Sequence, residues 1–313
     1  MNSTLKGVQM NQLRTTFLSL AAVSLAGALL TGCSNPSTVS DTAPQAAKTS
    51  ASTAPVETDA AAAAALPQAI RDKGTLTVTM SQSSPPMHFM AADGTTTTGV
   101  DPEVATALGQ ALGLKTTVVS GPFDGIIPGI AAGKFDMAIS QMSPSAERMK
   151  VLDFVDYYQS GSGIGVAPGN PQQLTVDTLC GKRVGALKGS FQDLKRLPAL
   201  SEACTSTGKE AIQAMTYPDM QAPNLALTAG RIDAVYIDGP TLGYAIKQGG
   251  QIELLGEKDL SPVSIGFKKG AGLEKAVQLG MESLAKSGKY KEILDKWGVG
   301  TGAISDFAFN KAQ

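Results

Sequence analysis

The chain has 313 residues, with 26 Lys and Arg, 27 Asp and Glu, and a formal net charge of −1. This length is sufficient for two domains that each bury a hydrophobic core. The near-zero charge disfavours a nucleic-acid binder, and an aromatic content of 5% disfavours a base-stacking platform. A single histidine, His88, and three dispersed cysteines offer little for a metal site or a Ser-His-Asp hydrolase. We therefore expect no metal and no other cofactor.

The first 32 residues predict a secretion signal. They contain Lys6 and Arg14 but no acidic residue, and residues 17–30 form an apolar run interrupted only by two serines. This run is shorter than the roughly 20 apolar residues of a comfortable membrane span. It ends in Leu-Thr-Gly-Cys, which resembles a bacterial lipobox and predicts lipidation of Cys33. The protein would then be extracytoplasmic and anchored to the outer face of the cell membrane; the alternative is an ordinary signal with a chance cysteine.

Residues 33–68 predict a flexible tether. Ser, Thr, Ala and Pro dominate the segment, so it has few large apolar side chains with which to offset the entropy cost of ordering. The alanine run at 60–65 is an exception, because it can form a helix at the start of the folded part. The tether is expected to hold that folded part away from a membrane.

From about residue 69 the chain alternates between strand and helix patterns. The predicted strands are rich in β-branched residues, and the helices carry apolar residues about four apart. In chain order we predict a strand at 75–80, a helix at 102–113, a strand at 115–120, a helix at 124–133, a strand at 135–140, an extended segment at 160–167, a helix at 175–179, a strand at 183–187, a helix at 190–206, a strand at 211–216, a helix at 224–230, a strand at 233–237, a helix at 241–248, strands at 252–255 and 263–267, and helices at 272–287 and 290–297. This alternation predicts an α/β fold with mainly parallel sheets, and the Gly-rich extended segment between the two series predicts two lobes.

Polar residues follow three of the predicted strands, at the edge where open α/β sheets bind ligands. Ser143 and Arg148 follow the third strand, and an arginine offers a bidentate donor to a carboxylate, although a surface turn is the favoured interpretation of the pattern alone. Ser190 follows a later strand and forms a capping-box pattern with Asp193. Asp238 can either cap the next helix or hold a cation, and capping is the favoured role.

Short stretches in an unbroken order carry a resemblance to a known family. They are Asp-Gly-Ile-Ile-Pro at 124–128, Gly-Lys-Phe-Asp-Met-Ala-Ile-Ser at 133–140, Glu-Arg at 147–148, Val-Leu-Asp-Phe at 151–154, Lys-Gly-Ser at 188–190, Gly-Arg-Ile-Asp-Ala at 230–234, Asp238, and Gly-Lys-Tyr at 288–290 through Trp-Gly at 297–298. Together they resemble the amino-acid-binding proteins of bacterial ABC importers, solute-binding protein family three, over residues 74–298. The ending at 297–304 with Asn310, and the pair Cys180 and Cys204, are similar to an actinobacterial lipoprotein branch.

The resemblance implies a two-lobe periplasmic-binding-protein fold of type II. Two extended crossings, expected near 158–164 and 257–263, would form the hinge. Lobe one would comprise residues 69–160 plus 262–300 and lobe two residues 164–256, followed by a C-terminal tail at 301–313. A ligand closes such lobes because it makes contacts in the closed state that the open state lacks.

The resemblance also implies where an amino acid binds. Its α-carboxylate would meet Arg148 and the N–H groups near Ser143 and Ser190, and its α-ammonium group would meet Asp238 in the other lobe. The rest of the expected lining is Ser81, Ser84, Phe123, Gln141, Met142, Leu187 and Phe191. Ser81 and Ser84 stand where the family often has an acid and an aromatic, so we expect a polar, uncharged amino acid rather than Lys or Arg.

The implied function is delivery of this amino acid to an ABC importer whose permease and ATPase are separate chains. We expect a monomer that is not an enzyme and binds no nucleic acid. Two alternatives stay open: a ligand-sensing module for a membrane partner, and an enzyme similar to cyclohexadienyl dehydratase on the same fold.

Cys180 and Cys204 are expected to form a disulfide in lobe two. They are the two cysteines left once Cys33 is lipidated, and an extracytoplasmic compartment is oxidising. They flank a strand and a helix that can fold back to bring the two side chains together.

Overall fold

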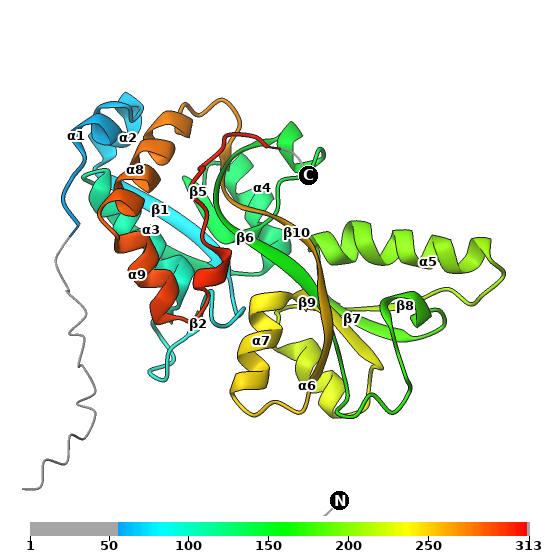
Figure 1. The fold of residues 1–313 in the computed structure, drawn as a ribbon. Coiled ribbons are helices and arrows are strands. Elements are labelled where there is room, and N and C mark those ends of the chain that lie inside the picture. The colour runs from blue at the N-terminus through cyan, green and yellow to red at the C-terminus, as the bar shows by residue number, and fades with distance from the viewer. Residues whose placement is uncertain (1–55, 312–313) are drawn as a thin grey trace, which may run out of the picture. The chain divides into compact units, whose positions relative to one another are not determined.

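The computed structural model describes residues 56–311, and an eight-stranded mixed sheet with helices on both faces organises them (Figure 1). The predicted signal, Cys33 and most of the predicted tether lie outside these residues. No helix within residues 56–311 combines the length and the apolar character that a bilayer crossing needs.

The strands have the order β4-β1-β5-β10-β6-β9-β7-β8. Their bounds are β1 Thr75–Ser81, β4 Lys115–Gly121, β5 Met137–Met142, β6 Leu152–Val166, β7 Arg183–Leu187, β8 Gln213–Tyr217, β9 Ala234–Asp238 and β10 Glu253–Lys268. The outer strands are parallel to their neighbours, with β1 between β4 and β5 and β7 between β8 and β9. The central strands β6 and β10 are antiparallel to each other and to β9 and β5. A separate hairpin joins β2 (Phe89–Met90) to β3 (Thr97–Thr98).

Strands β6 and β10 run through both lobes and form the two predicted crossings. At one end β10 pairs with β5 of lobe one, and at the other end β6 pairs with β9 of lobe two. The predicted strands at 252–255 and 263–267 are one continuous strand. A register shift in the β10–β6 ladder spans Gly256, and Pro262 stays in the ladder opposite Gln159. The α/β fold with two lobes joined by two crossings is confirmed.

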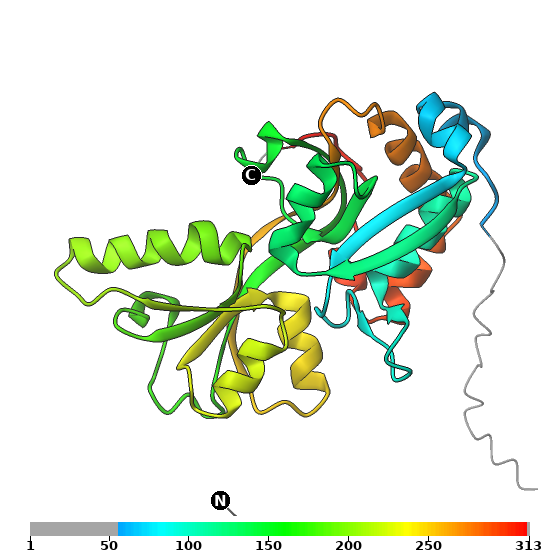
Figure 2. The same cartoon turned by 180° about the vertical axis from the view of Figure 1, so that it is seen from behind.

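Helices cover both faces of the lobe-one strands (Figures 1 and 2). Their bounds are α3 Val100–Ala111, α8 Glu274–Lys286 and α9 Lys289–Lys296 on one face, and α4 Ile126–Ala131 on the other. Side chains alternate along β5, so Met137 and Ile139 join the core under α3 and α8 while Ala138 joins the core under α4. Each face of the sheet therefore has its own buried layer.

Lobe two carries α5 (Leu197–Ser206), α6 (Ala222–Thr228) and α7 (Gly239–Lys247). A π-helical turn at Gln192–Arg196 leads into α5, and lobe two also has a short 3₁₀ turn at Val176–Thr178. Three other 3₁₀ turns lie outside lobe two, at Phe123–Gly125, Arg148–Lys150 and Gly300–Gly302. The predicted helix at 190–206 is thus a π turn followed by an α-helix.

The folded part of lobe one begins earlier than the predicted boundary. Helix α1 (Ala60–Ala64) is capped by Asp59, whose carboxylate accepts the N–H of Ala62 at 2.9 Å, and α2 follows at Gln68–Lys73. Ala62 and Leu66 are buried in the core that contains α8. The helix expected for the alanine run at 60–65 is therefore present, and apolar packing on lobe one ends the tether before residue 60 rather than at residue 68.

The C-terminal tail also packs on lobe one. Phe307 is buried with 4% of its surface exposed. The Asn310 side chain donates to Asp153 at 2.9 Å and accepts the N–H of Phe154 at 2.8 Å. These contacts place the described part of the tail against β6.

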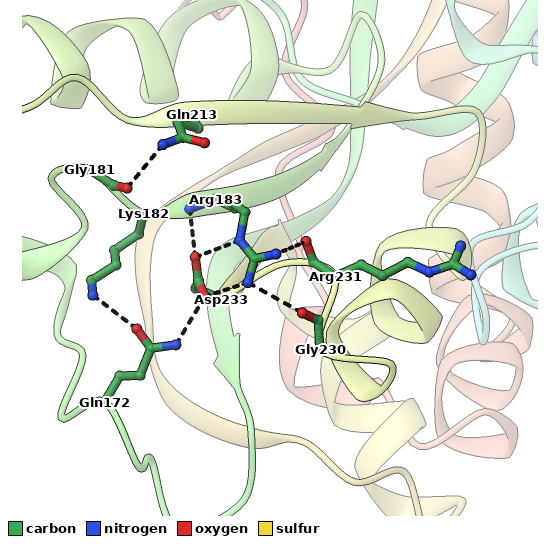
Figure 3. Close-up of polar contacts among 8 residues, drawn as sticks. All are labelled: Gln172, Gly181, Lys182, Arg183, Gln213, Gly230, Arg231 and Asp233. Atoms are coloured by element: carbon green, nitrogen blue, oxygen red, sulfur yellow. Dashed lines mark hydrogen bonds and ion pairs between the residues drawn. The ribbon is translucent and has the colours of Figure 1, made fainter.

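An ion pair joins the beginnings of β7 and β9 (Figure 3). Arg183 donates through Nη2 and Nε to the two carboxylate oxygens of Asp233 at 2.8 and 3.1 Å, and Gln172 adds a third donor at 3.0 Å. These donors hold the pKa of the Asp233 carboxyl well below its usual range. The pair lies at the amino ends of the strands, so the Gly-Arg-Ile-Asp stretch at 230–233 has a structural role.

The predicted disulfide is confirmed. Cys180 and Cys204 are bonded, with Cα atoms 5.6 Å apart, and the bond ties the turn before β7 to the last turns of α5. It closes a loop across a sequence separation of 24 residues.

Candidate ligand-binding site

A pocket lies where the carboxyl ends of β1, β5, β7 and β9 meet. Ten of the predicted ligand residues line it, six from lobe one and four from lobe two. They are Ser81, Ser84, Phe123, Gln141, Ser143, Arg148, Leu187, Ser190, Phe191 and Asp238. Four further lining residues were not predicted from the sequence; they are His88, Ser140, Gln192 and Met220.

Met142 departs from the prediction. It is fully buried in the core beneath α4 and is not part of the lining. Its neighbours Gln141 and Ser143 do line the pocket. The prediction is therefore corrected at Met142.

Arg148 is a buried cation at the lobe-one wall. Its side chain donates through Nη1 to the carbonyl oxygen of Ser143 at 2.8 Å and through Nη2 to that of Gly189 at 3.0 Å. The guanidinium lies over the Phe123 ring, 5.5 Å from the centroid. Burial lowers the pKa of Arg148 to about 10, and the charge of Asp238 opposes that shift. The surface-turn interpretation is wrong, because only 7% of this arginine is exposed.

Asp238 is the carboxylate at the lobe-two wall. It stands at the amino end of α7 but its side chain makes no capping hydrogen bond. Instead Gln192 Nε2 donates to Asp238 Oδ1 at 2.8 Å and to Ser162 Oγ at 2.9 Å. Burial raises the pKa of Asp238 to about 6, although the Gln192 hydrogen bond and the charge of Arg148 act in the opposite direction. A bound cation would therefore stabilise this carboxylate.

Ser190 forms one of the two hydrogen bonds of the predicted capping box. Its Oγ accepts the N–H of Asp193 at 3.1 Å, and Asp193 in turn accepts the N–H of Gly189 at 2.9 Å. The N–H of Ser190 itself donates to the carbonyl of Leu187 at 3.0 Å. Gln192, two residues after Ser190, points toward Asp238. No local sequence pattern indicated that direction.

His88 belongs to a buried hydrogen-bonded chain. Its Nε2 contacts Ser81 Oγ, its Nδ1 lies 2.7 Å from Asp101 Oδ2, and the Tyr157 hydroxyl donates to Asp101 Oδ1 at 2.6 Å. Each of these four side chains is at least 99% buried. The order of groups is that of a Ser-His-Asp triad, which composition alone had disfavoured. However, the N–H of Ser81 donates to Ser140 Oγ at 2.9 Å and so is not free to stabilise an oxyanion.

Contacts between the lobes enclose the pocket. Ser84 Oγ lies 3.0 Å from Thr241 Oγ1 of α7, and the N–H of Met220 donates to the carbonyl of Ser83 at 2.9 Å. At the exposed rim, Lys188 forms an ion pair with Asp124 at 2.9 Å. Together with the Arg148–Gly189 hydrogen bond, these contacts describe a closed arrangement of the two lobes.

Comparisons with known proteins agree with this architecture. Residues 76–300 match the family described as bacterial extracellular solute-binding proteins, family 3. The arginine-binding protein ArgT of Corynebacterium glutamicum is 26% identical over 250 residues, which is 79% of this chain and 82% of that protein. The L-cystine-binding protein TcyJ of Escherichia coli is 29% identical over 233 residues, which is 73% of this chain and 84% of that protein.

A solved relative has the same fold. An ancestral arginine-binding protein, solved with arginine and with glutamine, is 30% identical and covers 72% of this chain and 98% of its own. Its two structures have TM-scores of 0.65 and 0.64 to the present one. From the match over residues 76–300 and this shared two-lobe architecture, the chain belongs to family 3 of the bacterial extracellular solute-binding proteins.

Proposed function

We propose that this protein captures a polar, uncharged L-α-amino acid between its lobes and delivers it to an ABC importer. The observation that carries the proposal is the pair Arg148 and Asp238, a buried guanidinium and a half-buried carboxylate from different lobes that line one pocket. A carboxylate satisfies the guanidinium and an ammonium group satisfies the carboxylate. A zwitterion does both, and so provides each charge with a partner.

The relatives support an amino acid as the ligand. ArgT is named for arginine and TcyJ for cystine, and the ancestral protein was solved with both arginine and glutamine. All three are named as binding proteins rather than enzymes, which favours a transport component over a dehydratase. Arginine is thus the main competitor that an assay has to separate from an uncharged ligand.

The lining supports an uncharged ligand side chain. Among the described residues around the pocket, Arg148 and Asp238 are the only arginine, lysine, aspartate or glutamate, and the α-groups of the ligand would occupy both. Asp101 lies behind His88 and already accepts two hydrogen bonds within the wall. A guanidinium side chain would therefore lack a carboxylate in direct contact.

The proposal includes location and partners. We place the protein outside the cytoplasm as a monomer, held by a lipid on Cys33, with a permease and an ATPase on separate chains. The basic and apolar pattern of residues 1–32 and the extracellular family support this location. The lobes would keep their predicted bounds, with residues 60–68 and the packed tail added to lobe one.

A thermal-shift screen of the mature protein against the twenty L-amino acids tests the proposal. A ligand at a thousand times its Kd adds about 4.1 kcal/mol to the free energy of unfolding. Each kcal/mol raises the Tm of a protein of this size by about 2–4 °C, so the true ligand should give a shift of several degrees. No shift with any amino acid would refute the function, and a dominant shift with arginine would refute the uncharged side chain.

Substituting the lipobox cysteine should release the protein from the membrane. The Cys33→Ala variant lacks the thiol that takes the lipid, so it should appear in the soluble fraction while the parent protein stays with membranes. The Ser34→Ala variant is the matched control and should fractionate like the parent. Identical fractionation of the Cys33→Ala variant and the parent would rule out the lipid anchor.

Ligand affinity should fall about tenfold per pH unit below pH 6, because the ammonium group must then displace a proton from Asp238. The free energy of unfolding of the ligand-free protein responds to falling pH in the opposite direction. The folded-state pKa of about 6 exceeds the reference value of 3.8, so the Asp238 carboxyl destabilises the neutral-pH fold by about 3 kcal/mol, and this cost is relieved as pH falls from 6 toward 4. Calorimetry between pH 4.5 and 7.5 measures the affinity. Urea unfolding of the Asp238→Asn variant should lack this component of the pH dependence, and an affinity that stays flat from pH 5 to 7 would contradict the assignment.

A further inference from the structure

We propose that Ser81, Ser140 and Gln141 form a subsite for the end of the ligand side chain and that this subsite takes a carboxamide; the inference rests on the proposed function. The three residues lie at the carboxyl ends of β1 and β5, which are parallel neighbours in lobe one. All three line the pocket whose charged walls are Arg148 and Asp238.

Gln141 supplies a buried acceptor. Its Nε2 donates to Ser84 Oγ at 2.8 Å, whereas its Oε1 is buried without a hydrogen-bond partner among the described residues. Ser84, which holds the amide, is itself in contact with Thr241 of lobe two. The residue is 93% buried and has a φ of 48°, a left-handed conformation that is uncommon for a residue other than glycine. The backbone of Gln141 is strained and its amide nitrogen is anchored, so its unused oxygen is suited to accept a hydrogen bond from a ligand.

Ser81 supplies a second acceptor, because the buried chain behind it sets the direction of its proton. Asp101 accepts the Tyr157 hydroxyl and the Nδ1–H of His88. When the imidazole is neutral and its Nδ1–H is donated to Asp101, Nε2 is an acceptor and the Ser81 hydroxyl donates to it. The remaining lone pairs of Ser81 Oγ can then only accept from a ligand.

Ser140 supplies a donor. Its Oγ accepts the backbone N–H of Ser81 at 2.9 Å, which leaves its own hydrogen available. The subsite thus combines two acceptors with one donor. A carboxamide has two N–H donors and one carbonyl acceptor, and so matches this set. A guanidinium offers only donors and a charge that these neutral groups do not balance, while a carboxylate would face the two acceptor oxygens.

Isothermal titration of the mature protein with two isosteric ligand pairs tests the subsite. L-Glutamine is compared with L-glutamate, and L-asparagine with L-aspartate; one amide should bind at least 100-fold more tightly than its acid, and more tightly than L-arginine. The comparison uses the unaltered protein and so does not depend on the folding of a variant. If another uncharged amino acid binds but neither amide exceeds its acid, the subsite is refuted and the proposed function stands. If arginine binds best, the subsite and the uncharged ligand of the proposed function are both refuted, and only amino-acid capture stands. If no amino acid binds, the proposed function itself fails.

Two substitutions then locate the selectivity. Gln141→Met and Ser81→Ala each remove one acceptor and should reduce amide affinity at least tenfold while lowering the amide-to-acid ratio. Ser120→Ala is the matched control, since this hydroxyl lies on the neighbouring strand β4, contacts Thr97 at 3.0 Å and is not part of the lining. An unchanged amide-to-acid ratio in both pocket variants would overturn the assignment.

Discussion

Replacing Arg148 by alanine should weaken ligand binding by about 2–5 kcal/mol, which corresponds to a loss of about thirtyfold to several thousandfold in affinity. The substitution removes the guanidinium that the ligand carboxylate would meet and leaves that carboxylate unpaired in a desolvated pocket. It also removes the charge that lowers the pKa of Asp238. Titration calorimetry with the amino acid found in the screen measures the loss.

Lys188→Ala is the matched control for Arg148→Ala. Lys188 also places a cation between the lobes, where it pairs with Asp124, but 64% of its side chain is exposed. Exposed ion pairs contribute little, so this variant should bind nearly as tightly as the parent. Circular dichroism of both ligand-free variants should match the parent. Full affinity in Arg148→Ala would mean that the ligand carboxylate binds elsewhere.

Removing the disulfide should lower the free energy of unfolding by about 3.5 kcal/mol. The bond restricts the unfolded chain across a separation of 24 residues, and the chain-entropy relation gives about this value for such a loop. The double variant with Cys180→Ser and Cys204→Ser should therefore melt about 7–14 °C below the parent.

Urea denaturation of this double variant gives the energy directly. The parent protein treated with a reductant should resemble the variant, whereas the untreated parent should not. Two free thiols at these positions in the exported protein, counted by alkylation, would contradict the bond. An unchanged unfolding energy in the variant would show that the loop is restrained by its packing instead.

Most of the fold could be predicted from the alternation of strand and helix patterns. The hinge strand β10 was predicted as two pieces, because Gly256 and Pro262 are usually breaks and only the ladder with β6 shows how the strand continues through them. The hairpin of β2 and β3 was not predicted, since strands of two residues are too short for a periodicity. The alanine-rich segment at 60–68 lacks polarity patterning, and its docking depends on the surface of α8.

The positions of site residues that follow strand ends could be predicted from the sequence. The roles of residues that depend on contacts distant in the chain could not. Arg148 and Asp238 follow strands, but the pattern alone favoured a surface turn for one and a helix cap for the other. Their roles toward a ligand were implied by the family resemblance. The roles of His88 and Gln192 depend on partners far away in the chain, Asp101 with Tyr157 for one and Asp238 for the other. No local spacing encodes such pairings. A glutamine with one unused oxygen is likewise visible only once its neighbours are in place.

The β6–β10 pair limits how the lobes can separate. Two linkers that were independent would allow the lobes to rotate, slide and swing, but these strands are joined by a ladder over most of their length. Sliding one strand along the other would break that ladder, whereas bending both together out of the plane of the sheet preserves it. The register shifts on the lobe-two side of β10 mark where such a bend is easiest. Opening therefore has few degrees of freedom, and each closure brings the same side chains back into opposition without a search over lobe orientations. The two lobes can therefore open and close in every transport cycle, and the pocket between them regains the same geometry at each closure.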